Sequence, residues 1–249
     1  MNTAAGDKPF PESVQPMPDR ETGLIKDVKS LKKRICDEAT SAVGMLEAAL
    51  GALWELNCDA AKTVVERDAR IDQEEVAIEE AVFRVMTLKQ PVAREFRALA
   101  FILKANNDVE RVGDHASSIA KAAVKLSKAA PPGFNWPTSL LELGQRVPMA
   151  CHALLRALID EDAEAAKAIV VGDKSIDRLT RELFDETVKF MQTFPNAHAA
   201  GLLIYRIGRE LERVGDLMTN IAEDIVYLTT GEIIRHEKKR LRAEMGGGA

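Results

Sequence analysis

The sequence predicts an all-α protein made of two tandem three-helix bundles that are related by internal duplication. Three observations support this fold class. Apolar residues recur at intervals of three and four rather than two, which is the period of an amphipathic helix. Strong helix formers dominate the chain, and aromatic residues make up only 5% of it. A short segment of the first half also returns almost unchanged in the second half.

Three helices are expected in the first half of the chain. Helical apolar spacing runs over 24–56, 59–88 and 91–128. Pro91 opens the third segment, because its fixed φ angle and missing N–H group suit the first turn of a helix. Short connections make the three helices antiparallel neighbours.

A proline-rich segment over 131–137 then separates the two halves, and the three-helix plan repeats. The second set of helices is expected over 139–159, 163–193 and 196–228. The chain is thereby divided into four predicted regions: a disordered arm over 1–22, a first bundle over 23–130, a second bundle over 131–235 and a charged tail over 236–249.

The internal repeat is the clearest signal in the sequence. Glu110–Asp114 returns as Glu212–Asp216 at an offset of 102 residues. Upstream, at an offset of 105, Asp68–Asp72 corresponds to Asp173–Asp177. The difference of three residues falls in the turn between the second and third helices, where insertions are tolerated. Duplication therefore explains the matches better than chance.

Each repeat carries two pairs of acidic side chains at i, i+4 spacing, which places both carboxylates of a pair on one helical face. Asp72 and Glu110 lie 18 residues before and 20 residues after the turn near Gln90, so antiparallel helices bring them to similar heights. The same counting about the turn near Asn196 holds in the second repeat. Four carboxylates are expected at one level of each bundle. The eight candidates are Asp68, Asp72, Glu110, Asp114, Asp173, Asp177, Glu212 and Asp216.

Four like charges at one level raise each other's pKa unless a cation joins them. Hard divalent or trivalent ions that prefer oxygen ligands, such as Mg²⁺, Mn²⁺, iron or Ca²⁺, would relieve the repulsion. A solvated charged face is the alternative interpretation, because 29% of the residues are charged. The recurrence of the pairs at matched heights favours metal ions held in an exposed groove.

Other residues of the repeated segment have mainly structural interpretations. Gly113 and Gly215 lie inside helices at a cost of about 1 kcal/mol each relative to Ala. Their position at the edge of the apolar stripe indicates close approach of a neighbouring helix. Arg111 and Arg213 point outward. Each either pairs with the aspartate three residues further on or contacts a docking partner.

Several function classes are excluded or disfavoured. The net charge of −5 argues against a nucleic-acid partner, and no segment is long and apolar enough for membrane insertion. The three cysteines show no CxxC spacing, which favours a reducing cytoplasm over a disulfide framework. The chain has no ExxH pair, P-loop, GxSxG or HExxH motif, so no catalytic residue is predicted.

The two repeats, each with a (D/E)xERVGD element on its last helix and a DxxxD element on the preceding helix, resemble the PhoU family over about 24–232. This resemblance implies a cytoplasmic, non-enzymatic regulator that links the ATPase subunit of a phosphate ABC transporter to a sensor histidine kinase. It implies repression of phosphate uptake and of the phosphate-starvation response. Homodimers or larger homo-oligomers, and metal clusters on the eight carboxylates, are also implied.

Two further points follow from the residues themselves. The first DxxxD element is preceded by Glu66 and Arg67, whereas the second is preceded by Val171 and Gly172, so the two sites are expected to differ in affinity. Two other function classes stay open, namely a carboxylate-bridged multi-metal enzyme that acts on phosphoryl groups and a metal-free interaction module. The lack of a histidine among the candidates and their exposed face weigh against the enzyme.

Overall fold

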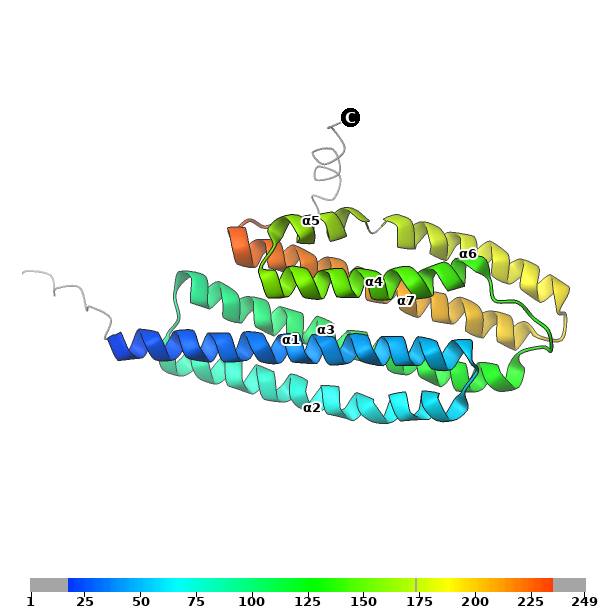
Figure 1. Ribbon diagram of the computed structural model, residues 1–249, viewed down its shortest axis with the longest axis horizontal. Coiled ribbons are helices and arrows are strands. Elements are labelled where there is room, and N and C mark those ends of the chain that lie inside the picture. The colour runs from blue at the N-terminus through cyan, green and yellow to red at the C-terminus, as the bar shows by residue number, and fades with distance from the viewer. Residues whose placement is uncertain (1–17, 173, 235–249) are drawn as a thin grey trace, which may run out of the picture.

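The computed structural model describes residues 18–172 and 174–234, which form seven α-helices and no β-strand. All of these helices run along the long axis of the molecule (Figure 1). The first three form one bundle, and the other four form a second bundle beside it. The predicted all-α fold with two tandem bundles is confirmed. The helices are α1 (Pro18–Trp54), α2 (Cys58–Lys89), α3 (Ala93–Ala129), α4 (Thr138–Asp160), α5 (Ala163–Gly172), α6 (Lys174–Thr193) and α7 (His198–Thr230).

Two of the helix starts that differ from the sequence prediction involve prolines. α1 begins at Pro18 rather than at residue 24, so the end of the arm predicted to be disordered is helical. A proline suits this first turn because its missing N–H group has no partner there. Pro91, predicted to open the third helix, instead precedes Val92, which is the N-cap of α3.

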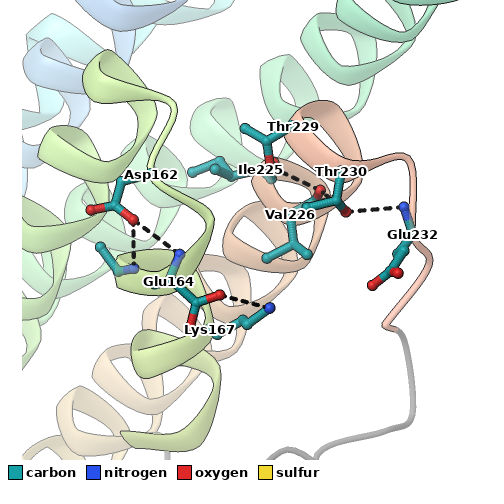
Figure 2. Close-up of polar contacts among 9 residues, drawn as sticks. Asp162, Glu164, Lys167, Ile225, Val226, Thr229, Thr230 and Glu232 are labelled. Carbon is teal, nitrogen blue, oxygen red and sulfur yellow. Dashed lines mark hydrogen bonds and ion pairs between the residues drawn. The ribbon is translucent and has the colours of Figure 1, made fainter.

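The stretch over 163–193 was predicted to be one helix, and the described residues on either side of residue 173 are helical, as α5 and α6. Residue 173, between them, lies outside the described residues. Residues 1–17 of the predicted arm and the whole predicted tail over 236–249 also lie outside them. α7 ends where Gly231 takes a φ of 79° and the N–H of Glu232 donates to the hydroxyl of Thr230 at 3.1 Å (Figure 2).

In both repeats the first helix ends and the second helix begins with the same local structure. Asn57 accepts two backbone hydrogen bonds from the first turn of α2, at 3.2 and 3.0 Å. Asp162, which follows 105 residues later, accepts two from the first turn of α5 at 2.9 and 3.0 Å (Figure 2). The preceding residues, Leu56 and Glu161, have φ values of 50° and 51°. The offset of 105 therefore extends back to the end of the first helix.

The two glycines of the repeated segment mark a close approach of the last helix to the second helix, as predicted. A Cβ on Gly113 would lie 3.2 Å from Cδ1 of Ile71, and a Cβ on Gly215 would lie 3.0 Å from Cδ1 of Ile176. Both isoleucines are buried. Because the two contacts are related by the offsets of 102 and 105, the two bundles pack these helices in the same register.

The last helices of the two repeats, α3 and α7, pack against each other and join the bundles (Figure 1). The buried stripe of α3 includes the predicted residues Val109, Val112, Ala116, Ile119 and Ala123. One continuous hydrophobic core runs through both repeats. The three cysteines are free thiols, and none of the described helices combines the length and apolar character needed to cross a lipid bilayer.

The glycine contacts lead to a stability prediction. In Gly51→Ala the new methyl group meets no atom within 4 Å, so better helix propensity should raise the free energy of unfolding by about 0.5–1 kcal/mol. In Gly215→Ala the methyl group crowds buried Ile176, and this variant should be about 1–3 kcal/mol less stable than Gly51→Ala. Urea denaturation of both variants measures the difference. Equal stabilisation by the two substitutions would show that α6 and α7 are not in close contact.

Candidate functional site

The first acidic cluster lies where α2 and α3 approach each other. Asp72 follows Ile71 and Asp114 follows Gly113, so the contact that packs the two helices also sets these carboxylates side by side. Asp68 and Glu110 lie one turn away on the same faces and are half-buried, whereas Asp72 and Asp114 are exposed.

The carboxylates of this cluster are close enough to perturb one another electrostatically. Burial raises the pKa of Glu110, and the charges of Asp114, Asp72, Glu75 and Asp68 raise it further. The pKa of Asp114 is also raised, first by burial and then by Asp68 and Asp72. Such mutual repulsion is what a bound cation relieves.

The second cluster is built in the same way between α6 and α7. Asp177 follows Ile176 and Asp216 follows Gly215, while the predicted ligand Asp173 lies outside the described residues. Burial raises the pKa of Glu212; Asp216 and Asp177 add to this and Arg209 opposes it, and the net pKa is raised. Asp177 and Glu212 line a cavity of about 560 Å³.

The charge balance differs between the two clusters. The guanidinium of Arg209 forms an ion pair with Glu212 in the second repeat. The equivalent position of the first repeat is Asn107, which carries no charge. There, the ammonium of Lys121 lies 3.9 Å from a carboxylate oxygen of Asp68. The second cluster therefore has an arginine directly on one of its predicted ligands, whereas the first has a more distant lysine and the charge of His115 near Asp114.

The donor chemistry of the clusters fits hard cations, because every predicted ligand is a carboxylate. Among the described residues, however, no three histidine, cysteine, aspartate or glutamate side chains converge closely enough to hold one metal ion. Ligation therefore requires side chains to rotate toward a shared ion. Asp72, Asp114 and Asp216 are exposed and have the space to do so.

The two arginines of the repeated segment point outward as predicted, but they pair with different acids. Nη1 of Arg111 lies 3.6 Å from Asp108, and Nη1 of Arg213 lies 3.5 Å from Glu210. Each arginine thus reaches back to the preceding turn, whereas the sequence predicted an aspartate on the following turn. Both side chains stay about half exposed, at 51% and 56%.

A buried polar contact between the repeats was missed by the sequence analysis. Nδ1 of His115 on α3 lies 2.8 Å from Oε2 of Glu210 on α7, and Glu210 is buried. Burial favours a higher pKa for Glu210, but the hydrogen bond and charge of His115, together with Arg213 and Arg206, lower the pKa overall. This contact ties the two repeats together at the α3–α7 interface.

Comparison with known proteins identifies the family. The family model described as "PhoU domain" matches the chain twice, over residues 35–123 and 140–225. The chain belongs to the PhoU family. The two matches fall on the two repeats, so each repeat of the tandem arrangement inferred from the sequence matches one PhoU domain.

Individual relatives agree with this assignment. The "phosphate-specific transport system accessory protein PhoU homolog" of Deinococcus radiodurans is 33% identical over 187 residues, which cover 75% of this chain and 87% of that protein. The Escherichia coli K12 accessory protein PhoU is 30% identical over 215 residues, covering 84% and 86%. The crystal structure of PhoU from Pseudomonas aeruginosa has a TM-score of 0.71 at 28% identity, covering 86% of this chain and 99% of that one.

A second solved relative is the phosphate transport system regulatory protein PhoU from Streptococcus pneumoniae, with a TM-score of 0.77 at 27% identity. It covers 84% of this chain and 98% of that one. These relatives are named accessory or regulatory proteins. The chain thus belongs to a family whose compared members carry the names of accessory or regulatory proteins rather than of enzymes.

The contact between His115 and Glu210 leads to a prediction for stability and pH. Glu210→Gln removes the charge but keeps the shape, and at pH 7 it should lower the free energy of unfolding by about 1–3 kcal/mol. Because the pKa of Glu210 is lowered in the folded protein, its stabilisation is present above the unfolded-state pKa and is lost as the pH falls through the lower folded-state pKa. Urea denaturation should therefore show a smaller gap between wild type and variant in acid. An exposed control, Glu55→Gln, should show no such change, and a gap for Glu210→Gln that is independent of pH would contradict the assignment.

Proposed function

We propose that this protein is a cytoplasmic helical adaptor that restrains phosphate uptake and represses the phosphate-starvation response when phosphate is ample. The observation that carries the proposal is the double PhoU-domain match to relatives named as accessory proteins of a phosphate-specific transport system. An adaptor of this kind acts by binding its partners and shifting their conformational populations rather than by catalysis.

The proposed partners are the ATPase subunit of a phosphate transporter and a sensor histidine kinase, with the adaptor itself forming homodimers or larger assemblies. Support comes from the different surfaces of the two repeats. The first repeat has a groove of about 870 Å³ whose lining includes Arg34, Asp37 and Arg67. The corresponding groove of the second repeat, about 480 Å³, includes Met149 and Ile169. A charged groove and an apolar groove suit two chemically different partners.

The proposal includes metal ions on the acidic clusters. Asp68, Asp72, Glu110 and Asp114 would hold ions in the first repeat, and Asp173, Asp177, Glu212 and Asp216 would do so in the second. A bound cation would neutralise the repulsion within each cluster and tie the second helix of a repeat to its last helix. The first cluster should bind more tightly, because Arg209 already compensates part of the charge of the second.

A metal-free interaction module is the second candidate, and one observation favours it. In the described part of the chain no three potential ligands converge on one point, and Glu212 already has a cationic partner. In this case the acidic faces would bind partner proteins directly. The third class considered from the sequence, a multi-metal enzyme, disagrees with the names of the relatives.

Metal binding by matched variants separates the two candidates. Protein stripped with a chelator is reloaded with Mn²⁺, and bound metal is measured by elemental analysis. Asp68→Asn/Asp114→Asn should weaken binding at the first cluster by about 10-fold or more, and Asp177→Asn/Asp216→Asn should remove a weaker set of ions. Glu55→Gln/Glu80→Gln, which removes the same charge from exposed positions, should behave as wild type. Equal metal content in all four proteins would reject ligation and leave the metal-free module.

The regulatory claim has a separate test in cells. Deletion of the gene should switch on a phosphate-responsive promoter at high phosphate, and the wild-type gene should restore repression. Complementation with Asp68→Asn/Asp114→Asn then shows whether the first cluster is needed for signalling. Intact repression in the deletion strain, in the absence of a substituting paralogue, would contradict the proposed role.

A further inference from the structure

The first repeat buries a polar pair at a place where the second repeat buries an apolar one. Glu38 on α1 is 3% exposed and Asn106 on α3 is 1% exposed. The offsets of 105 and 102 relate them to Leu143 and Gly208. In the second repeat, Cδ1 of Leu143 lies 3.7 Å from where a Cβ of Gly208 would stand. The repeat relation therefore places Glu38 and Asn106 opposite each other inside the first bundle.

Three oxygen atoms at this place lack a hydrogen-bond partner among the described residues. They are both carboxylate oxygens of Glu38 and Oδ1 of Asn106, and all three are buried. The Asn106 side chain is held in place because its Nδ2 donates to the backbone oxygen of Glu75 at 2.8 Å. Since an ionised carboxylate and an amide oxygen only accept hydrogen bonds, the three atoms cannot satisfy one another. When Glu38 is ionised, a ligand that supplies positive charge or hydrogen-bond donors would satisfy all three atoms.

The electrostatic surroundings favour a cation over a neutral donor. Burial and the charges of Glu74, Glu75 and Glu110 raise the pKa of Glu38 to about 8, against the opposing charge of Arg34. Arg34 is already engaged, with its Nε 2.8 Å from Oε1 of Glu74. Three carboxylates thus disfavour the charged form of Glu38, and Arg34, which opposes them, is shared with Glu74.

The site has an entry path from solvent. Glu38 belongs to the lining of the groove of about 870 Å³ on the first repeat, together with residues of both α1 and α2. The lining also includes the charged side chains of Arg67 and Arg70. Rotation of the buried Glu38 carboxylate toward the groove would let water molecules complete the coordination of an ion. The apolar pair of the second repeat offers no oxygen ligand at the equivalent place.

We propose that Glu38 and Asn106 bind one hard divalent cation, of the Mg²⁺ and Mn²⁺ class, which keeps several of its water molecules. Glu38 supplies carboxylate oxygens from α1 and Asn106 supplies its amide oxygen from α3. The site uses none of the eight carboxylates of the acidic clusters, and it does not depend on the proposed regulatory function. Its effect is to join the first helix to the last helix of the first repeat through the ion.

The test counts bound Mn²⁺ by electron paramagnetic resonance in oxygen-free buffer above pH 8, where Glu38 is ionised. The background is the full-length Asp68→Asn/Asp114→Asn protein, in which the first cluster is disabled. Adding Glu38→Leu/Asn106→Gly transplants the apolar pair of the second repeat into this background. We expect the bound Mn²⁺ to fall by one ion per chain, while far-UV circular dichroism stays unchanged.

A second variant distinguishes the loss of an ion from a folding defect. Glu38→Gln keeps the shape of the side chain, and it should lose the same ion and abolish the rise in melting temperature that Mg²⁺ produces in the background protein. Equal Mn²⁺ binding with and without Glu38 and Asn106 would overturn the proposal, and would indicate a buried proton on Glu38 instead. If the acidic clusters themselves bind no metal, the result is different: the Asp68→Asn/Asp114→Asn protein would then bind as much Mn²⁺ as wild type.

Discussion

The close contact of an isoleucine with a glycine, made once in each repeat, is the constraint on which the rest of the structure depends. Ile71 packs on Gly113 and Ile176 packs on Gly215, which fixes the height of the last helix relative to the second helix. In each repeat, the isoleucine and the glycine of the contact are each followed directly by an aspartate. The packing of the core therefore positions the acidic clusters, and no dedicated loop is required.

The two repeats share a backbone plan but differ in chemistry. The caps at Asn57 and Asp162 show how closely the local structure is retained. Against this common frame, Asn107 of the first repeat corresponds to Arg209 of the second, and buried Glu38 corresponds to Leu143. The first repeat thus lacks the arginine that pairs with a cluster carboxylate in the second repeat, and it buries a glutamate where the second repeat buries a leucine.

Much of this architecture could be predicted from the sequence, because helical periodicity and an internal repeat are both local signals. Counting residues from the hairpin turns brought the four carboxylates of a repeat to one level, since rise per residue is the same in every α-helix. The pairing of Arg111 with Asp108, and the contact between His115 and Glu210, depend on side-chain rotamers and on how the two bundles meet. Neither is encoded in spacing along one helix.

One missed feature did leave a signal. Glu38 falls on the apolar stripe that contains Ile35 and Ala42, and Asn106 falls on the stripe that contains Ile102 and Val109. A polar side chain at a core position of an amphipathic helix costs free energy unless it has a partner. A polar residue on the apolar stripe of a helix is therefore a more specific signal of a binding partner than a charged residue on the solvent face.

Anomalous diffraction from crystals loaded with Mn²⁺ tests most directly whether core packing positions carboxylates for a shared ion. We predict peaks between α2 and α3 and between α6 and α7, each about 2.0–2.6 Å from aspartate or glutamate oxygens, as for other hard cations. Peaks confined to other parts of the molecule, or aspartates turned to opposite flanks of their helices, would contradict the account.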